Sequence, residues 1–306
     1  MPSVAKVAAD HYASRRSLVN AAVKGISALW RQVSRTDFQT WADYIGRALA
    51  ILVGAQTAAA QQADEYVAAA LAAQGIEDSP AGRVLPSAFA GIASDGRDLS
   101  GLLWSPAVAA KMALAQGASP ARSLASGRAA LDMIVRTQVA DAGRVADGVA
   151  ITVRPTIGYV RLVNPPACAR CLILAGRFYR YSMGFQRHPQ CDCIHVPARG
   201  EQAAADEGLI NRPLDYFNSL SGSEQDKLLG RAGARAVRDG ADMAQVVNAR
   251  RGMTAAGTTR VGTSRHGLAG QRLGKGVVRL MPETIYSRAG SREEAINLLR
   301  QHGYII

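Results

Sequence analysis

All four cysteines of this 306-residue chain lie between residues 168 and 193. Cys168 and Cys171 form a C-x-x-C pair, and Cys191 and Cys193 follow about 20 residues later, with His188 just before them. Two short donor pairs joined by a loop of that length are typical of a closed tetrahedral zinc site, because each pair supplies two ligands from one turn. We therefore expect one structural zinc ion.

The spacing leaves the ligand set open on the second arm. Cys168 and Cys171 are the expected ligands of the first arm, whereas His188, Cys191 and Cys193 are three donors for the two remaining places. Either four thiolates, or three thiolates and one imidazole, would complete the site. No acidic residue has the spacing expected for activating a zinc-bound water, so the sequence favours a structural zinc over a catalytic one.

Two other roles are open to these cysteines. They could be inert core residues, although four in under a tenth of the chain is hard to attribute to packing. They could also form two disulfides in an oxidising compartment. The N-terminal segment is not typical of a signal peptide, since Asp10, His11 and Arg15 interrupt its apolar run. A reduced chain favours metal binding, and His195 is expected outside the coordination sphere.

The positive charge is concentrated in the second half of the chain. Residues 1–150 carry 14 Lys and Arg against 12 Asp and Glu, and the remainder carries 22 against 12. Residues 250–279 contain seven glycines, seven basic residues and no acidic residue, a composition that favours a flexible cationic arm suited to a polyanion. We expect non-specific nucleic-acid contact through the basic side chains of this tract, which are Arg250, Arg251, Arg260, Arg265, Arg272, Lys275 and Arg279.

The first 130 residues predict a helical block. Hydrophobic residues make up 48% of the chain, but no run of 18 apolar residues occurs, so we expect no membrane partner. Apolar spacing predicts helices over 3–31 and 38–74, with Gly75 ending the second. Shorter helices are predicted at 86–93, 99–104, 107–116 and 120–142. Ser119 is a suitable N-cap for the last of them, with Pro120 at its first position.

After Asp147-Gly148 the pattern changes from helical to alternating. Residues 151–155 and 159–163 predict a β-hairpin that turns at Gly158, and 178–181 and 193–196 predict short strands beside it. We therefore expect a small β-layer held together by the zinc ion.

The C-terminal part returns to helical patterning. The Ser221 to Glu224 capping box predicts a helix to about residue 238, a shorter helix follows at 243–249, and Ser291 is expected to cap the last helix. The second helix of the pair lacks the exposed basic residues of a DNA-reading helix, so sequence-specific recognition is not favoured.

The predicted fold is mainly α. A helical bundle in residues 1–130 precedes a small α+β zinc-stabilised domain in 131–215. A helical basic C-terminal region in 216–306 contains the glycine-rich tract 250–279.

Six stretches carry a resemblance to a known family: VRTQVADAGR at 135–144, GYVRLVNPPACARC at 158–171, LAGR at 174–177, GFQRHPQCDC at 184–193, and the segments 216–221 and 240–252. They resemble the phage Mu F-like minor head proteins of tailed phages that infect actinobacteria, over roughly residues 95–306. The resemblance implies a minor capsid or head morphogenesis protein with a few copies inside the procapsid. It implies the portal protein and packaged DNA as partners, with the major capsid or scaffold protein as a further candidate. The expected location is the virion interior, and the host cytoplasm during assembly.

Relatives of this group are often labelled capsid maturation proteases, which is an alternative of a different class. A serine protease needs a nucleophile, a base and an orienting group, and Ser264 with His266 is the closest Ser–His approach outside the cysteine cluster. Both lie in the glycine-rich tract, which is poorly suited to holding a catalytic geometry. We therefore predict a non-enzymatic head protein, with a maturation protease and a non-specific DNA-binding protein as the alternatives.

Overall fold

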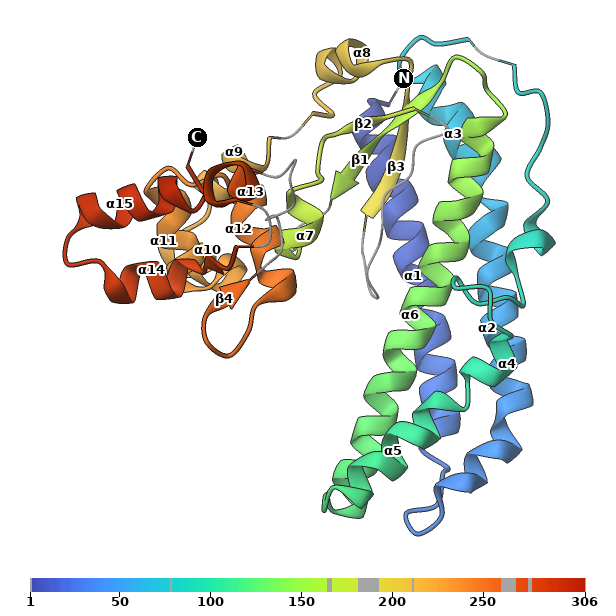
Figure 1. Ribbon diagram of the computed structural model, residues 1–306. Coiled ribbons are helices and arrows are strands. Elements are labelled where there is room, and N and C mark those ends of the chain that lie inside the picture. Colours follow the sequence, from blue (N-terminus) through green and yellow to red (C-terminus); the bar gives the residue numbers. More distant parts are fainter. Residues whose placement is uncertain are drawn as a thin grey trace. The chain divides into compact units, whose positions relative to one another are not determined.

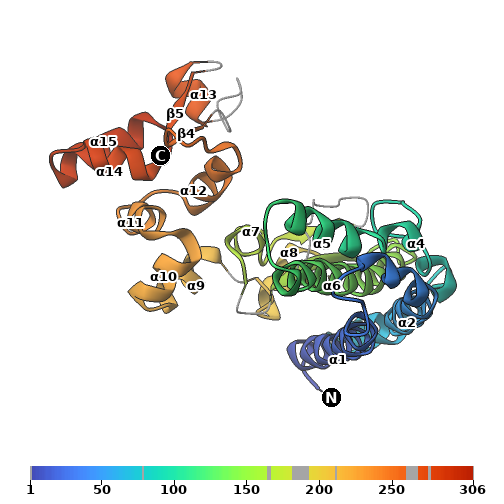
Figure 2. The same ribbon diagram turned by 90° about the horizontal axis from the view of Figure 1, so that it is seen from below.

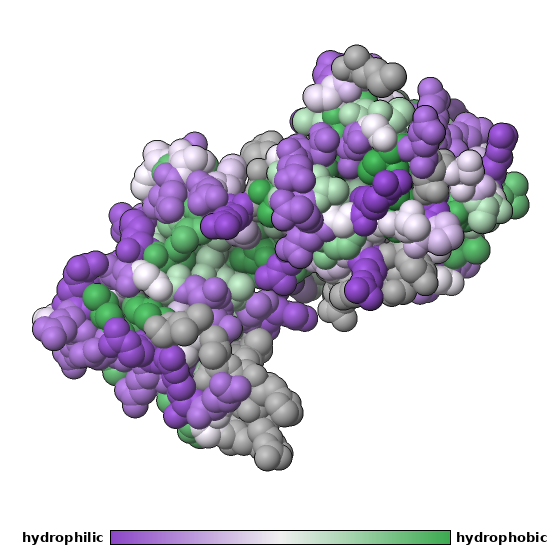
Figure 3. All heavy atoms as spheres, turned by 90° about the horizontal axis from the view of Figure 1, so that it is seen from above, coloured by the Kyte–Doolittle hydropathy of each residue, from purple (hydrophilic) through white to green (hydrophobic). Residues whose placement is uncertain are grey.

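The computed structural model describes seven stretches of the chain: 2–77, 79–163, 167–180, 193–210, 212–259, 268–274 and 277–305. The chain folds into two compact units (Figure 1). Unit 1 consists of Met1–Leu162 and Arg177–Ile210, and unit 2 consists of Val163–Gly176 and Asn211–Ile306. Helices dominate both units, which agrees with the predicted mainly α fold. Hydrophilic side chains cover most of the face drawn in Figure 3, with smaller hydrophobic areas between them.

Four helices build the body of unit 1: α1 (Val4–Trp30), α2 (Ala42–Gln61), α3 (Ala63–Ala72) and α6 (Pro120–Thr152). Helices α1, α2 and α6 pack against one another along their length (Figures 1 and 2). Ser119 caps α6 as predicted, because its side chain accepts a hydrogen bond from the backbone N–H of Arg122. The indole N–H of the fully buried Trp41 donates to the carbonyl oxygen of Leu103 at 2.7 Å. The core is thus anchored by a tryptophan whose polar atom is satisfied.

Shorter elements cover the bundle: η1 (Phe38–Trp41), η2 (Pro86–Phe89), α4 (Leu99–Leu102) and α5 (Ser105–Ala115). Helix α5 packs on the first turns of α6. The approach is close at Gly127, where an added Cβ would lie 2.4 Å from Cζ2 of Trp30 and 2.7 Å from the carbonyl oxygen of Pro106. Only glycine fits this position without moving its neighbours.

A three-stranded sheet lies at one end of the helices of unit 1, in the order β2-β1-β3 (Figure 1). Its strands are β1 (Gly158–Val163), β2 (Phe178–Tyr179) and β3 (Cys193–Ala198), and α8 (Glu201–Asp206) follows. Strands β1 and β2 are antiparallel, with Tyr159 opposite Tyr179. Helix α3 packs against β3, where the hydroxyl of Tyr66 donates to the carbonyl oxygen of His195 at 2.8 Å.

The prediction of a hairpin strand at residues 151–155 is wrong. Helix α6 continues through Asp147 and Gly148 to Thr152, and the next strand begins only at Gly158. The buried residues Ala146, Ala150 and Ile151 continue the apolar face of α6. Burial of this face outweighs the local alternation that favoured a strand.

The long helix predicted over 38–74 is also divided. A 3-10 turn occupies Phe38–Trp41, and Gln62 separates α2 from α3. Gly75 has a φ of 65°, so the predicted end of this helical region is confirmed.

Unit 2 is built of short helices around its own core. They are α7 (Ala169–Leu172), α9 (Pro213–Ser219), α10 (Gly222–Leu229), α11 (Arg231–Arg238), α12 (Met243–Ala249), η3 (Arg250–Gly252), α13 (Leu268–Leu273), α14 (Pro282–Arg288) and α15 (Arg292–Gln301). Two short antiparallel strands, β4 (Thr258–Thr259) and β5 (Arg279–Leu280), pair with each other. Phe217, Leu299 and Tyr304 are fully buried in this core.

Helix signals in the sequence of unit 2 are largely confirmed. Ser221 and Glu224 form the predicted capping box, and Ser291 caps α15. The helix predicted to reach residue 238 is nevertheless interrupted at Gly230, whose φ is 73°. A change of chain direction at this glycine therefore separates α10 from α11.

The domain boundaries predicted after residues 130 and 215 stay predictions. Residue 130 lies inside α6, and residue 215 lies inside α9. Across the described residues, none of the helices combines the length and apolar character needed to span a membrane.

Candidate metal-binding residues and a buried polar cluster

The first pair of candidate zinc ligands forms a compact turn in unit 2. Cys168 is the residue before α7, and its sulfur accepts a hydrogen bond from the backbone N–H of Cys171 at 3.4 Å. Cys168 is exposed, whereas Cys171 is buried. An N–H group directed at sulfur favours the thiolate, which is the form that binds metal. The following residues, Leu172 and Ile173, are part of the unit 2 core and fix this turn.

The structure describes only part of the second arm. Cys193 begins β3 in unit 1, where it is buried and its carbonyl oxygen accepts from Nη1 of Arg144 at 3.3 Å. His188 and Cys191 lie outside the described residues. Within the described stretches, no three His, Cys, Asp or Glu side chains form a group that could hold a metal ion. The zinc site and its ligand set therefore stay a prediction.

His195 is a buried aromatic-core residue of unit 1. Its ring lies against that of Tyr159, with the centroids 4.3 Å apart and the planes tilted by 30°. Tyr159 in turn stacks on Tyr179 at a centroid distance of 5.3 Å. The imidazole is thus held in a layer of rings that joins all three strands of the sheet.

A second group of buried polar residues lies in unit 1, and sequence analysis missed it. Nη2 of Arg15 donates to Oδ2 of Asp147 at 2.6 Å, and Nε2 of His11 lies 3.3 Å from the same oxygen. His11 stacks face to face on Tyr66, with ring centroids 3.6 Å apart. We call His11, Arg15, Tyr66 and Asp147 the buried polar cluster. It connects α1, α3 and α6.

Charge pairing decides the ionisation of this cluster. Burial by itself raises the pKa of Asp147, but the Arg15 guanidinium and the neighbouring His11 outweigh it and hold this pKa at about 2. Burial, reinforced by the negative charge of Asp147, raises the pKa of Tyr66 well above its usual value. Asp147 is therefore a buried carboxylate, and Tyr66 a neutral hydrogen-bond donor.

Close packing leaves little freedom around Arg15. A Cβ at Gly143 would lie 2.7 Å from Nε of Arg15, so the guanidinium occupies space that a larger residue on α6 would fill. His11 and Arg15 stand four residues apart on α1, and Asp147 interrupts the apolar face of α6. A polar residue inside an apolar helical face was the available signal, but it did not identify the partner. This arrangement fixes α1 against α6 and offers no open position for a substrate.

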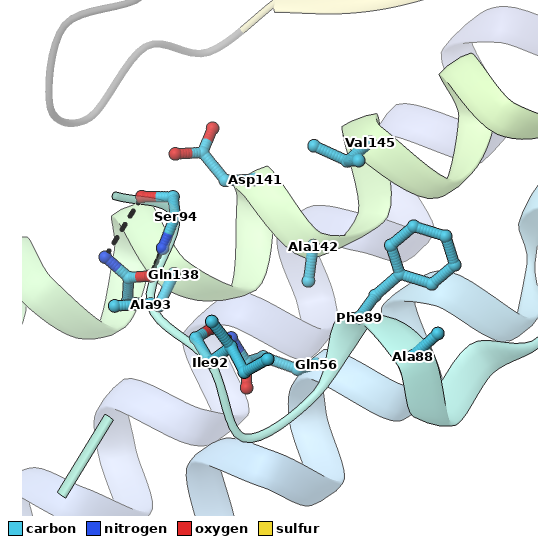
Figure 4. Close-up of a pocket in the computed structure, with 10 residues that line it drawn as sticks. All are labelled: Gln56, Ala88, Phe89, Ile92, Ala93, Ser94, Gln138, Asp141, Ala142 and Val145. Carbon is cyan, nitrogen blue, oxygen red and sulfur yellow. Dashed lines mark hydrogen bonds between the residues drawn. The ribbon is translucent and has the colours of Figure 1, made fainter. Parts of the chain in front are cut away.

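Unit 1 also has a pocket of about 210 Å³ between α2, the segment 88–94 and α6 (Figure 4). Phe89, Ala142 and Val145 form its apolar walls, and the carboxylate of Asp141 lies at one side. Oδ1 of Asp141 accepts from Nη2 of Arg144 at 2.6 Å. The pocket is small and mostly apolar.

Most of the described cations of the tract 250–279 are engaged within unit 2. Arg279 is only 1% exposed, and its guanidinium donates to the carbonyl oxygens of His302 and Gly303 at 2.8 and 3.0 Å. It also lies 3.7 Å from the ring centroid of Tyr304. The expectation that Arg279 belongs to a flexible cationic arm is therefore wrong, because this side chain holds the C-terminal turn in the core.

Other members of the tract differ in their surroundings. Nη1 of Arg272 donates to the carbonyl oxygens of Arg300 and Ile305, and Arg250 pairs with Glu283 at 2.7 Å. Arg251 is exposed. The remaining predicted residues lie outside the described stretches, namely Arg260, Arg265 and Lys275 as nucleic-acid contacts and Ser264 and His266 as alternative catalytic residues.

The sequence matches the family described as VG15 protein over residues 1–212. This match covers more than half of the chain, so the chain belongs to the VG15 family, which is a family of viral proteins. The matched region includes both parts of unit 1 and the segment that carries the four cysteines. Neither a curated protein nor a solved structure matches the chain.

Proposed function

We propose that this VG15 family protein is a minor capsid or head morphogenesis protein of a tailed bacteriophage. The observation that carries the proposal is the family match over residues 1–212, which limits the chain to viral roles. The Mu F-like segments around the cysteines support a role in the head, inside the procapsid and in contact with the portal protein. The chain would be present in the host cytoplasm during assembly and in the virion afterwards.

The features of the described residues support a structural role. The helices of unit 1 are tied together, since the Arg15–Asp147 pair of the buried polar cluster joins α1 to α6 and the Trp41 indole is hydrogen-bonded inside the core. The pocket beside Phe89 is small, and its Asp141 carboxylate is paired with Arg144. A helical body tied together in this way suits an assembly component.

Zinc binding is part of the proposal. Cys168 and Cys171 would supply two thiolates, and two of His188, Cys191 and Cys193 would complete the coordination. The N–H···S hydrogen bond at Cys168 supports the first pair. When bound, the ion would contribute folding free energy directly, as structural zinc does in other small sites.

Contact with packaged DNA would use exposed arginines of unit 2. Arg231, Arg235 and Arg238 are exposed on α11 at positions i, i+4 and i+7, so they form one row along the helix. The Arg235 guanidinium lies 4.1 Å from the ring centroid of Tyr286 and 3.8 Å from the Asp239 carboxylate, and Arg238 pairs with Asp226 at 3.2 Å, so contact with DNA would exchange these carboxylate partners for phosphate oxygens. These contacts hold two of the three cations at the surface. Such a row suits a phosphate backbone without reading its sequence.

Co-purification with the portal protein of the same phage tests the proposed function. The tagged chain is co-expressed with the portal protein, and separately with a tail-tube protein of the same phage as a control. We expect the portal protein to co-elute with the chain on size exclusion, and the tail protein not to do so. The same co-expression is repeated with the major capsid protein. If neither the portal protein nor the major capsid protein co-elutes with the chain, the proposal is contradicted.

A further inference from the structure

Helix α5 buries its small apolar residues and exposes its large ones, the reverse of the usual arrangement. The side facing the bundle carries the buried residues Pro106, Ala107 and Ala110. Larger apolar side chains face solvent: Trp104, Val108 and Met112 are 43, 51 and 57% exposed. Trp104 directly precedes α5, and the three residues are spaced four apart, so they line one side of the helix and its N-terminal end. We call these three residues the α5 face.

Packing inside unit 1 explains the small residues but not the large ones. Ser123 and Gly127 are buried residues of α6. A Cβ added at Gly127 would lie less than 3 Å from the Trp30 ring and from the carbonyl oxygen of Pro106. This close approach admits only small side chains between the helices. Val108 and Met112 are more than half exposed, so burial within unit 1 does not account for them. Single exposed apolar residues are common on protein surfaces, but three in helical register form a contiguous patch of the kind used for protein binding.

The charge around the α5 face is positive. Residues 99–131 contain three basic residues and no acidic one, and the three basic residues, Lys111, Arg122 and Arg128, are all exposed. The turn after α1 lies at the same end of unit 1 and adds exposed Arg31 and Arg35 (Figure 1). Two exposed carboxylates, of Asp37 and Asp43, belong to this end as well, and that of Asp37 accepts the backbone N–H of Gln39. The residue before α4, Asp98, is exposed too, and its carboxylate accepts the backbone N–H of Gly101. Five cations against three carboxylates favour a negatively charged partner.

We propose that the α5 face docks an acidic amphipathic helix of a partner protein. The apolar side of that helix would pack on Trp104, Val108 and Met112, and its flanking carboxylates would pair with Lys111 and the neighbouring arginines. Tryptophan and methionine suit such a surface, because the indole buries a large area and the thioether adapts to its neighbour. The inference rests on the geometry of unit 1 and is independent of the proposed role in the phage head.

The protein carries its own reporter for this interaction. Of the three tryptophans, Trp30 and Trp41 are 3 and 0% exposed, whereas Trp104 is 43% exposed. Changes in fluorescence on ligand binding therefore arise mainly from Trp104. The probe is a tryptophan-free helical peptide with leucines at i, i+4 and i+8 and glutamates at the flanking positions. Its matched control has lysine in place of every glutamate. With the full-length chain, we expect the glutamate peptide to shift the emission to shorter wavelength and to reduce acrylamide quenching saturably.

Surface variants separate the apolar and the charged contributions. Val108→Ser combined with Met112→Ser should weaken binding of the glutamate peptide at least about tenfold, because two buried apolar side chains are lost from the contact. Lys111→Glu should weaken the same peptide by roughly threefold and should bring the lysine peptide closer to it in affinity. Leu85→Ser removes a side chain that is 66% exposed elsewhere in unit 1, and it should leave binding unchanged. Circular dichroism melting should be the same for all variants.

Four results would overturn the proposal. The first is no saturable binding of the glutamate peptide, and the second is equal binding of the glutamate and lysine peptides. The third is that neither peptide binds, whereas phosphatidylglycerol vesicles bind and the Val108 and Met112 changes abolish vesicle binding. This result would assign the surface to lipid. The fourth is self-association that the same double variant abolishes, again without peptide binding, which would assign it to a second copy of the chain.

Discussion

Replacing Asp147 by asparagine should destabilise unit 1 strongly. The carboxylate is fully buried, and it is the acceptor for Nη2 of Arg15 at 2.6 Å. Asparagine keeps the size of the side chain but removes its charge, so Arg15 stays buried as an uncompensated cation. The effect should appear as a loss of unfolding free energy, with the backbone fold retained at neutral pH.

Two estimates set the size of this loss. Removing one partner of a buried ion pair costs about 3–5 kcal/mol. The pKa of Asp147 lies at about 2 against a reference of 3.8, which corresponds to a contribution on the order of 2 kcal/mol from the ionised form. The second value counts only the change in protonation of Asp147. Asparagine also disturbs the hydrogen bonding of Arg15, so the loss should exceed this value. We expect a decrease of about 3 kcal/mol.

Urea unfolding followed by tryptophan fluorescence is the appropriate assay. All three tryptophans lie in unit 1, so the signal reports on the unit that contains the pair. Because the folded-state pKa of Asp147 is lowered, its stabilising contribution is present above pH 3.8 and is lost as the pH falls toward 2. The Asp147→Asn variant should lack this part of the acid dependence. Asp10→Asn is the matched control, since Asp10 is exposed on α1 and pairs with exposed Lys6.

The control should change the unfolding free energy by less than about 0.5 kcal/mol. A second variant, Arg15→Met with Asp147→Leu, removes both charges and should recover most of the stability lost by Asp147→Asn. A loss of less than about 1 kcal/mol of unfolding free energy in Asp147→Asn would refute the stabilising role of the Arg15–Asp147 pair. An acid dependence between pH 3.8 and 2 equal to that of the wild type would refute it as well.

Three further predictions concern the cysteine cluster and unit 2. Protein purified without chelator should contain one zinc ion per chain by elemental analysis, and Cys171→Ser should release it and lower the melting temperature; metal-free wild type with four titratable thiols would contradict this. Arg279→Gln should destabilise unit 2 by about 2–3 kcal/mol in calorimetry, because carbonyl groups of the C-terminal turn lose their donor, and an unchanged melting transition would argue against that role. Replacing the three α11 arginines by glutamine should reduce the slope of log K against log salt concentration for duplex DNA binding by about 2–3 units; the three are Arg231, Arg235 and Arg238. An unchanged slope would exclude α11 as the DNA contact.

The sequence could predict elements whose signals are local. Ser119 with Pro120 began α6, the Ser221 capping box began α10, and Gly75 ended the second helical region, because each depends on backbone groups a few residues away. The strand predicted at 151–155 failed for the opposite reason. Those residues follow a helix whose buried face extends past Gly148, and the packing of distant elements on that face is not encoded in the local alternation.

Long-range partners explain what the sequence could not show of the sites. His11 and Arg15 meet an aspartate more than 130 positions away, so their pairing requires the packed bundle. Arg279 looked like a member of a solvated tract, and only the carbonyl acceptors of the C-terminal turn make it a buried residue. The outward side of α5 was likewise hidden, because apolar residues at helical spacing ordinarily predict a core face.

The most direct test of the proposed role is the amount of this protein in purified phage particles. Targeted mass spectrometry would compare the chain with the major capsid protein in DNA-free procapsids and in DNA-filled virions of the phage that encodes it. A minor head protein should be present in both particles, in a small and constant number of copies per particle, and should resist removal by external protease. Absence from both particles, in cells where the chain is expressed during infection, would contradict the assignment to the phage head.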